Sequence, residues 1–293
     1  MKEERNWPNQ KKIKKCKKTI DKAFVLWYTY NVIKKERDWI MTISYPKRYE
    51  SIDLKEKEYL MFIDIETIGT INVLESCLPF EIGMKIIDIK NDKIMVEKSY
   101  LVRKFFNNKY IMLSTFSATK YPNYFEKLEN DKRYKLYSAN EIAKDLKNLM
   151  KKYNIDTMVA HNGKFDYTML NMYFEEFEIA SPFEKISVLD TMEMSKTITM
   201  SSDYENYCIE NQNVKNSMNE SCFITNSGRV RTTAQAIYSY LTKNANFQEA
   251  HTGLEDISIE YEIFKASLPL LNNGMCKLNT APTWKQYQVV VNQ

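Results

Sequence analysis

Three apolar runs separated by short polar segments follow one another in the first half of the chain. They cover residues 60–66, 80–89 and 94–102. Runs of this length bounded by turn-forming residues predict strands. Since consecutive strands with short connections usually pair with each other, we expect an antiparallel beginning to a sheet.

The pattern then changes to an alternation of helices and strands. Ser138 and Glu141 form a capping-box sequence ahead of apolar residues at helical spacing. A buried strand is predicted at 155–160, a second helix from Asp166, and a further strand at 187–190. The alternation predicts an α/β fold, in which helices flank a sheet of mixed strand direction.

The last third of the pattern is less regular. Residues 196–229 are polar and rich in Asn and Ser, and they predict an inserted loop or hairpin. Helices are expected again at 232–241 and from about residue 254. The last twenty residues carry no clear signal.

Length and composition fit either two domains or one large domain with extensions. The 293 residues are 44% hydrophobic and 13% aromatic, which excludes a largely disordered chain. We expect a basic, aromatic-containing extension over 1–58, a domain over 59–272 that contains the insertion, and a C-terminal tail over 273–293.

Charge is distributed unevenly along the chain. Residues 1–58 carry 16 Lys and Arg against 9 Asp and Glu, and seven of the twelve residues from Lys11 to Lys22 are lysines. Several aromatic residues follow, so the extension is suited to a phosphate backbone and to base stacking. A solvated basic helix that packs through its aromatic residues, or an element that docks a partner, explains the same pattern.

The five cysteines are scattered and include no closely spaced pair, which argues against a zinc site or a disulfide framework. The longest apolar run, 23–28, is far too short for a membrane span, and the charged first 22 residues do not resemble a signal peptide. We therefore expect a cytoplasmic protein without a membrane partner. The abundance of Lys, Ile and Asn is typical of an AT-rich genome such as a virus or phage, in which case the compartment is the host cytoplasm.

Two acidic residues interrupt the first predicted strand. Asp64 and Glu66 are two positions apart, so their side chains point to the same face. Carboxylates in an apolar strand are unfavourable without a partner, and hard cations such as Mg²⁺ or Mn²⁺ prefer oxygen ligands. The spacing alone is weak, because Asp203 and Glu205 repeat it in the polar segment, and a structural pair remains the alternative.

The only two histidines of the chain precede further acidic residues at predicted helix starts. His161 precedes Asp166, and His251 precedes Asp256. An ordinary N-cap is the simpler explanation for Asp166. A shared cleft that receives both acidic residues is the functional one.

Taken in order, three segments resemble the three exonuclease motifs of the DEDDh subgroup of DnaQ-like 3′–5′ exonucleases. They are FIDIETIG at 62–69, HNGKFD at 161–166 and HTGLED at 251–256. Glu81-Ile-Gly83 and Leu189-Asp190-Thr191 add to a resemblance that covers about residues 59–270. Family members usually have Ala where Gly253 stands, a difference that we expect to matter little. Thr252 stands where the tyrosine subgroup has Tyr.

The resemblance implies an RNase H-like fold and a two-metal-ion centre. It assigns four ligands of two divalent ions, Mg²⁺ or Mn²⁺: Asp64, Glu66, Asp166 and Asp256. It also makes His251 the general base, and it assigns substrate binding to Thr67, Ile68, Gly69 and Asn162. His161 we interpret as structural.

The expected function is metal-dependent 3′–5′ exonuclease activity at the 3′ ends of single-stranded or frayed DNA or RNA. Two alternatives remain open: an exonuclease-like module that binds nucleic acid or a polymerase, and a phosphodiesterase acting on short oligonucleotides or nucleotide signals. A proofreading role would require a polymerase or another replication protein as partner. The long insertion before His251 bears on the choice of substrate.

Overall fold

The computed structural model describes residues 51–69, 77–114, 116–216, 218–270, 275–278 and 289–290. The chain divides into two units, Met1–Tyr45 and Pro46–Gln293, and all described residues belong to the second. Nearly all of the predicted extension and most of the predicted tail lie outside the described residues. The predicted boundaries therefore stay predictions.

A six-stranded mixed sheet forms the centre of the second unit, in the order β5-β4-β3-β2-β6-β7. The strands are β2 (Tyr59–Thr67), β3 (Pro79–Asp88), β4 (Lys93–Val102), β5 (Tyr134–Tyr137), β6 (Thr157–Ala160) and β7 (Ser187–Asp190). Strand β3 is antiparallel to both neighbours, and the other adjacent pairs are parallel. The predicted α/β fold, a sheet of mixed strand direction with an antiparallel beginning and flanking helices, is confirmed.

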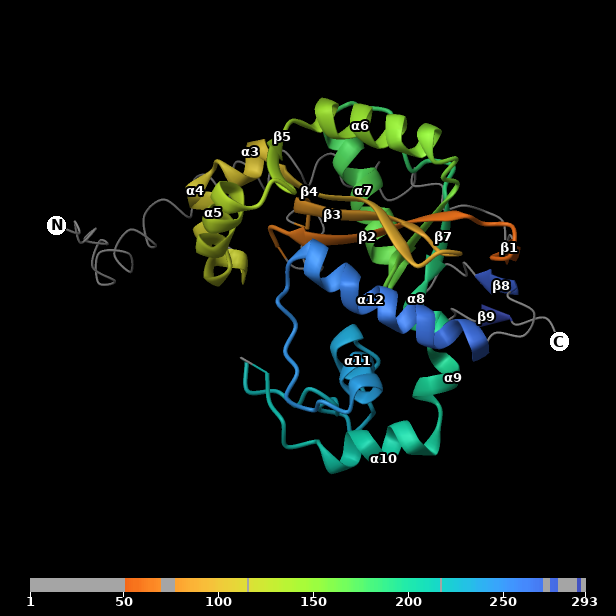
Figure 1. The fold of residues 1–293 in the computed structure, drawn as a ribbon. Coiled ribbons are helices and arrows are strands. Elements are labelled where there is room, and N and C mark those ends of the chain that lie inside the picture. Colours follow the sequence, from red (N-terminus) through yellow and green to blue (C-terminus); the bar gives the residue numbers. More distant parts are fainter. Residues whose placement is uncertain are drawn as a thin grey trace, which may run out of the picture. The chain divides into compact units, whose positions relative to one another are not determined.

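Helices cover both faces of this sheet (Figure 1). The helices α6 (Ala139–Lys152) and α7 (Gly163–Glu176) lie on one face, and α12 (Gly253–Ser267) crosses the other. The predicted capping box starts α6, because Ser138 accepts the Glu141 N–H and Glu141 accepts the Ser138 N–H.

The segment between β4 and β5 contains four short elements that the hydrophobic pattern does not predict. They are α3 (Arg103–Phe106), α4 (Lys109–Ser114), η2 (Phe116–Thr119) and α5 (Tyr121–Asn130). Each is too short to show a helical period over several turns. Aromatic contacts, such as those of Phe106 with Tyr121 and Tyr124, hold them together.

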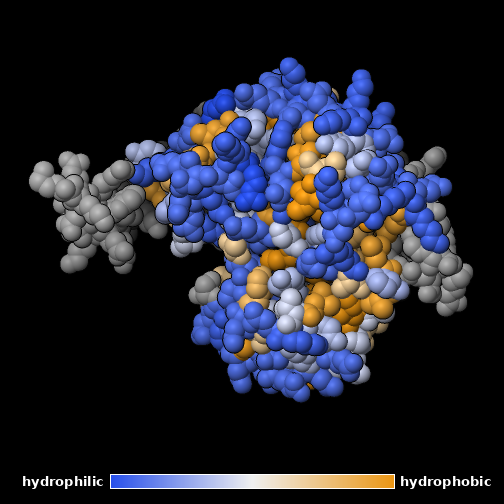
Figure 2. Space-filling view, viewed as in Figure 1, coloured by the Kyte–Doolittle hydropathy of each residue, from blue (hydrophilic) through white to orange (hydrophobic). Residues whose placement is uncertain are grey.

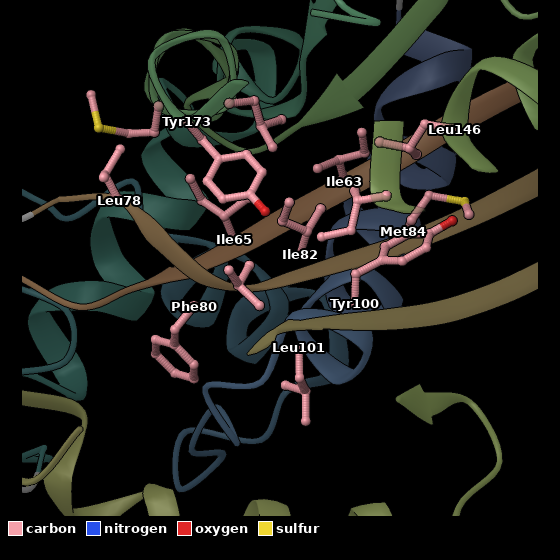
Figure 3. Packing of buried hydrophobic residues seen from close by; sticks show 14 of the residues in the cluster. Ile63, Ile65, Leu78, Phe80, Ile82, Met84, Tyr100, Leu101, Leu146 and Tyr173 are labelled. Atoms are coloured by element: carbon pink, nitrogen blue, oxygen red, sulfur yellow. The ribbon is translucent and has the colours of Figure 1, made fainter. Parts of the chain in front are cut away.

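Strand β2 is buried on both faces, and the alternation of its side chains divides the core in two. Ile63 and Ile65 pack with Leu146 of α6 and Tyr173 of α7 (Figure 3). Phe62, on the other face, makes edge contacts with aromatic rings of α12. By the same alternation, Asp64 and Glu66 point toward α12.

The insertion is more helical than the sequence indicates. The first part of residues 196–229 forms two helices, α9 (Lys196–Thr199) and α10 (Ser202–Glu210). The prediction of a loop or hairpin is therefore wrong for this first part. Asp203 and Glu205 lie in the first turn of α10, not in a loop. The remainder does include hairpin-like bridges, Lys215 with Ser221 and Ile224 with Val230.

A second small core explains why this segment folds. Tyr204 and Phe223 are fully buried with residues of α11 (Ala234–Thr242), and this cluster packs on Ile259 and Ile263 of α12. Helix α12 therefore contacts the sheet through one side and the insertion through another. Figure 2 shows hydrophobic residues gathered around α12 and α11 on an otherwise mostly hydrophilic face.

The remaining elements are short. They are α8 (Thr191–Met194), η3 (Leu268–Leu270) and a three-stranded sheet of β1 (Ser51–Asp53), β8 (Met275–Leu278) and β9 (Val289–Val290). None of the described helices has the length and apolar character of a membrane span.

Two glycines let α12 approach the sheet at backbone distance. A Cβ atom on Gly253 would lie 2.8 Å from the Gly83 nitrogen and 2.9 Å from the Asp64 carbonyl oxygen. A Cβ atom on Gly83 would lie 2.7 Å from the Gly253 Cα. The expectation that one methyl group at residue 253 matters little is therefore wrong for this chain, because backbone atoms occupy the space.

We expect Gly253→Ala to lower the free energy of unfolding by about 1–3 kcal/mol, because α12 must move away from β2 and β3 to accommodate the methyl group. Urea denaturation followed by circular dichroism measures the change. Glu262→Ala, on an exposed position of α12, is the matched control and should change stability by less than about 0.5 kcal/mol. Equal stabilities of G253A and the wild type would contradict the close approach.

Candidate active site

The first acidic pair lies where β2 ends beneath the start of α12. Asp64 is partly buried and Glu66 is only 7% exposed, so both carboxylates are largely removed from water. The pairing of β2 with β3 shifts register between Glu66 and Thr67. Such an irregularity ends regular pairing and redirects the side chains beside it.

Asp166 reaches this strand end from the first turn of α7. The ladder between β2 and β6 pairs Met61 with Met158 and Phe62 with Val159. Burial raises the pKa of Asp166 well above its usual value, and the backbone of Ile65, farther along β2, opposes this shift. Asp166 is not the N-cap, since that position belongs to Asn162, whose backbone is left-handed and whose side chain makes no cap hydrogen bond. The simpler explanation of Asp166 as an N-cap is therefore wrong.

Asp190, at the end of β7, rather than Asp166, accepts hydrogen bonds from the backbone N–H groups at the start of α7. Its carboxylate accepts the N–H groups of Asn162 and Gly163 at 2.9 and 3.1 Å, and that of Met192 at 2.9 Å. Because Asp190 takes these donors, the Asp166 carboxylate is available for other chemistry.

The third motif brings His251 and Asp256 to the same place. Ligand atoms of Glu66, His251 and Asp256 all lie within 4.8 Å of one another. His251 has a left-handed backbone with φ of 54°, and its side chain remains about half exposed. Non-glycine residues in this conformation are uncommon and concentrate at functional sites.

Burial and mutual repulsion dominate the electrostatics of the cluster. Burial raises the pKa of Asp64 well above its usual value, and the charges of Glu260, Asp256 and Asp166 raise it further. Burial raises the pKa of Asp256 to about 9, with Glu249 and Glu66 adding to the effect. Such groups become favourable as anions when a cation lies among them.

A lysine compensates part of this charge. Lys120, just before α5, places its Nζ 3.2 Å from Glu66 Oε2. Burial still raises the Glu66 pKa to about 7, although Lys120 opposes the shift. Burial, assisted by the charge of Lys120, lowers the pKa of His251 to about 4, so its imidazole is neutral at neutral pH.

The predicted substrate-binding residues lie beside the acidic cluster. Thr67 and Ile68 are buried at the end of β2, the Thr67 hydroxyl donates to the Gly69 carbonyl at 2.8 Å, and the Ile68 N–H donates to Leu78 at 3.0 Å. Asn162 lies at the joint before α7. Their roles in binding stay predictions.

His161 lies apart from the His251 cluster, as its structural interpretation predicts. Its Nδ1 lies 3.0 Å from the Thr191 hydroxyl and its Nε2 lies 2.9 Å from the Thr232 carbonyl oxygen. Burial lowers its pKa to about 4, so the ring is neutral and donates one hydrogen bond. The contact with Thr232 connects the strand-to-helix joint to the segment that enters α11.

Glu81 is a structural carboxylate. In the sequence, only the resemblance of Glu81-Ile-Gly83 to the exonuclease family drew attention to it. It is fully buried in β3 and accepts hydrogen bonds from the Tyr124 and Ser99 hydroxyls and, at 3.2 Å, from the Gly253 N–H. It thereby fixes the start of α12 to the sheet and to α5.

Two further glutamates of the site escaped the sequence reasoning. Glu249 lies two residues before His251, and burial raises its pKa to about 7. Glu260 is 2% exposed and lies one helical turn after Asp256. The sequence offered one signal for Glu260, its position four residues after Asp256, which puts both side chains on the same side of the predicted helix.

No protein-family model and no curated protein matches this chain. Solved structures do match it. One is a 3′-exonuclease described as recognising the 3′ end of a histone mRNA stem-loop, at 12% identity over 80% of this chain and 91% of the other, with a TM-score of 0.49. Another is the nuclease domain of 3′hExo, a DEDDh family member bound to rAMP, at 13% identity over 77% and 98%, with a TM-score of 0.46.

E. coli exonuclease I bound to a dT13 oligonucleotide also matches, at 13% identity over 72% of this chain, with a TM-score of 0.43. The chain spans 41% of the length of that protein. The likeness is one of fold.

We expect the metal-free protein to lose stability as the pH rises from 6.5 to 8.5. Asp256 keeps its proton in the folded state up to pH about 9, whereas the unfolded chain releases it near pH 4, so each further pH unit favours unfolding by about 1.4 kcal/mol. The two histidines are neutral in the folded state and about half protonated in the unfolded chain at pH 6.5, so they oppose the trend only up to about pH 7.5. Thermal melts in EDTA should show a fall of about 5 °C or more.

Added Mg²⁺ should flatten or reverse this fall, because a bound cation stabilises the deprotonated carboxylates. Matched melts with Mg²⁺ in place of EDTA measure the difference. A midpoint that is constant or rises with pH in EDTA would contradict the proposed repulsion in the cluster.

Proposed function

We propose that this chain is a metal-dependent 3′–5′ exonuclease that hydrolyses phosphodiester bonds at the 3′ ends of single-stranded or frayed DNA or RNA. The observation that carries the proposal is the convergence of Glu66, His251 and Asp256 within 4.8 Å of one another. Asp64 lies two residues before Glu66 in β2, and it interacts electrostatically with Asp166 of α7. Three segments far apart in sequence supply these residues.

The donor set fits hard divalent cations. Asp64, Glu66, Asp166 and Asp256 offer carboxylate oxygens, which Mg²⁺ and Mn²⁺ prefer. Asp256 Oδ1 is buried and has no hydrogen-bond partner among the described residues, and burial with neighbouring charge raises the pKa values of the group. Two bound ions would polarise the phosphate and stabilise the entering and leaving oxygens.

His251 is suited to accept the proton of the attacking water. Its ring is neutral at neutral pH, and it lies beside two of the proposed ligands while remaining half exposed. Its Nδ1 lies 3.8 Å from Glu249 Oε2, too far for a hydrogen bond, so a ring nitrogen is available to accept the proton.

The remaining groups suit the substrate end. Thr67, Ile68 and Gly69 would hold the terminal nucleotide through backbone groups and an apolar contact, and Asn162 would orient the chain at the joint. Lys120, already beside Glu66, would attract the phosphate. Hydrolysis of short oligonucleotides would use the same residues and stays the second candidate, since no observation distinguishes long from short nucleic-acid substrates. A polymerase partner stays a prediction.

An oligonucleotide with a 5′ label, tested as DNA and as RNA with Mg²⁺ or Mn²⁺, should shorten from its 3′ end. EDTA and Asp64→Ala should both abolish the ladder, because each removes the cations or a principal ligand. Denaturing gel electrophoresis measures the products. If the wild type binds the oligonucleotides and never shortens them, the chain is a binding module; products from dinucleotides only would favour the second candidate.

The two histidines provide a separate test. His251→Asn should lower kcat by about 100-fold or more, since the base is lost, yet keep its stability because Asn tolerates the left-handed backbone. His161→Ala should instead lower the free energy of unfolding by about 1–3 kcal/mol, because buried partners lose their hydrogen bonds. Single-turnover rates and thermal melts of both variants measure these effects. Equal rates for His251→Asn and His161→Ala would overturn the assignment of His251 as the base.

A further inference from the structure

Helix α12 presents a second carboxylate to the site, one turn after Asp256. Glu260 and Asp256 are four residues apart and therefore lie on the same side of the helix. Glu260 is 2% exposed, although Glu262, two positions later, is exposed to solvent. The carboxylate of Glu260 is thus directed inward, on the side of α12 that carries the proposed ligand.

Only half of this carboxylate is satisfied by protein groups. Glu260 Oε1 accepts the His161 backbone N–H at 3.1 Å. Glu260 Oε2 is buried and has no hydrogen-bond partner among the described residues, a property that it shares with Asp256 Oδ1. An unsatisfied buried carboxylate oxygen is unfavourable, and a cation is a partner that would remove the penalty.

Glu260 interacts electrostatically with two other proposed ligands. After burial, its charge is the largest cause of the raised pKa of Asp64, and the charge of Asp166 is the largest such cause for Glu260. Lys120 pairs with Glu66, on the part of the site nearer to His251.

We propose that Glu260 is a fifth carboxylate of the metal centre, held through Oε1 by the His161 N–H so that Oε2 binds a divalent cation together with Asp64 and Asp166. The proposal rests on the proposed function, because it assumes the metal centre described above. It also gives the strand-to-helix joint a defined part in the site: the backbone of His161 positions a ligand, while its ring holds Thr191 and Thr232.

The test is Mn²⁺ binding to the full chain at pH 7.5, measured by isothermal titration calorimetry without any nucleic acid. Glu260→Gln keeps the size of the side chain and an acceptor for the His161 N–H, and removes the negative charge. We expect its Mn²⁺ affinity to fall by about 10- to 100-fold, as for other groups that support a metal site. Glu262→Gln, exposed on the same helix, is the matched control and should bind as the wild type does.

Thermal melts in EDTA separate a ligand from a merely structural residue. Glu260→Gln should melt at a higher temperature than the wild type without metal, because repulsion with Asp64 and Asp166 is relieved, and it should gain less from Mn²⁺. An unchanged Mn²⁺ affinity, or a lower melting temperature in EDTA with an unchanged gain from Mn²⁺, would overturn the proposal. If Glu260→Gln does not fold, Glu260→Asp, which withdraws the carboxylate by one methylene, must still weaken Mn²⁺ binding.

The result also separates this proposal from the one on which it rests. If the wild type binds two Mn²⁺ ions and Glu260→Gln binds them with the same affinity, only the proposed role of Glu260 is overturned. A wild type that binds no Mn²⁺ overturns the metal centre itself, and the part of Glu260 with it.

Discussion

Repulsion among buried carboxylates is the constraint around which this structure is arranged. Asp64, Asp166 and Asp256 converge where β2 passes beneath α12, with little water to screen them. Acidic groups in such surroundings either hold protons or require cations. The scaffold must therefore supply enough apolar burial and hydrogen bonding elsewhere to keep these side chains together, and the same unfavourable interaction makes the site receptive to divalent ions.

The scaffold meets this requirement with close backbone contacts and two structural carboxylates. Gly83 and Gly253 let α12 approach the sheet, and Glu81 fixes the first N–H of that helix. Asp190 performs the corresponding task at the start of α7. Because these two acidic residues satisfy the helix starts, Asp166 and Asp256 remain available within the first turns, where the partial positive charge of a helix N-terminus favours anions.

Helix α12 also couples the site to the insertion. Its Ile259 and Ile263 pack in the small core around Tyr204 and Phe223, while Phe264 packs against the sheet. The ring of His161 adds a polar connection to Thr232. A change in the packing of the insertion would therefore move the helix that carries Asp256 and Glu260. This gives the segment a physical route to influence the acidic cluster through α12.

The sequence by itself determined five of the six strands of the central sheet, all except β5, together with the capped helix at Ser138 and the acidic positions of the three motifs, because alternation, capping and short-range spacing are local properties. It did not determine the short helices between β4 and β5 or α10 in the insertion, whose stability comes from aromatic and core contacts between distant residues. Tertiary structure alone decided that Asp190 rather than Asp166 satisfies the start of α7, that Gly253 has no room for a methyl group, and that Glu260 is buried with Oε1 on the His161 N–H. Each of these depends on which backbone or charge a distant segment brings within reach, and no local pattern encodes that proximity.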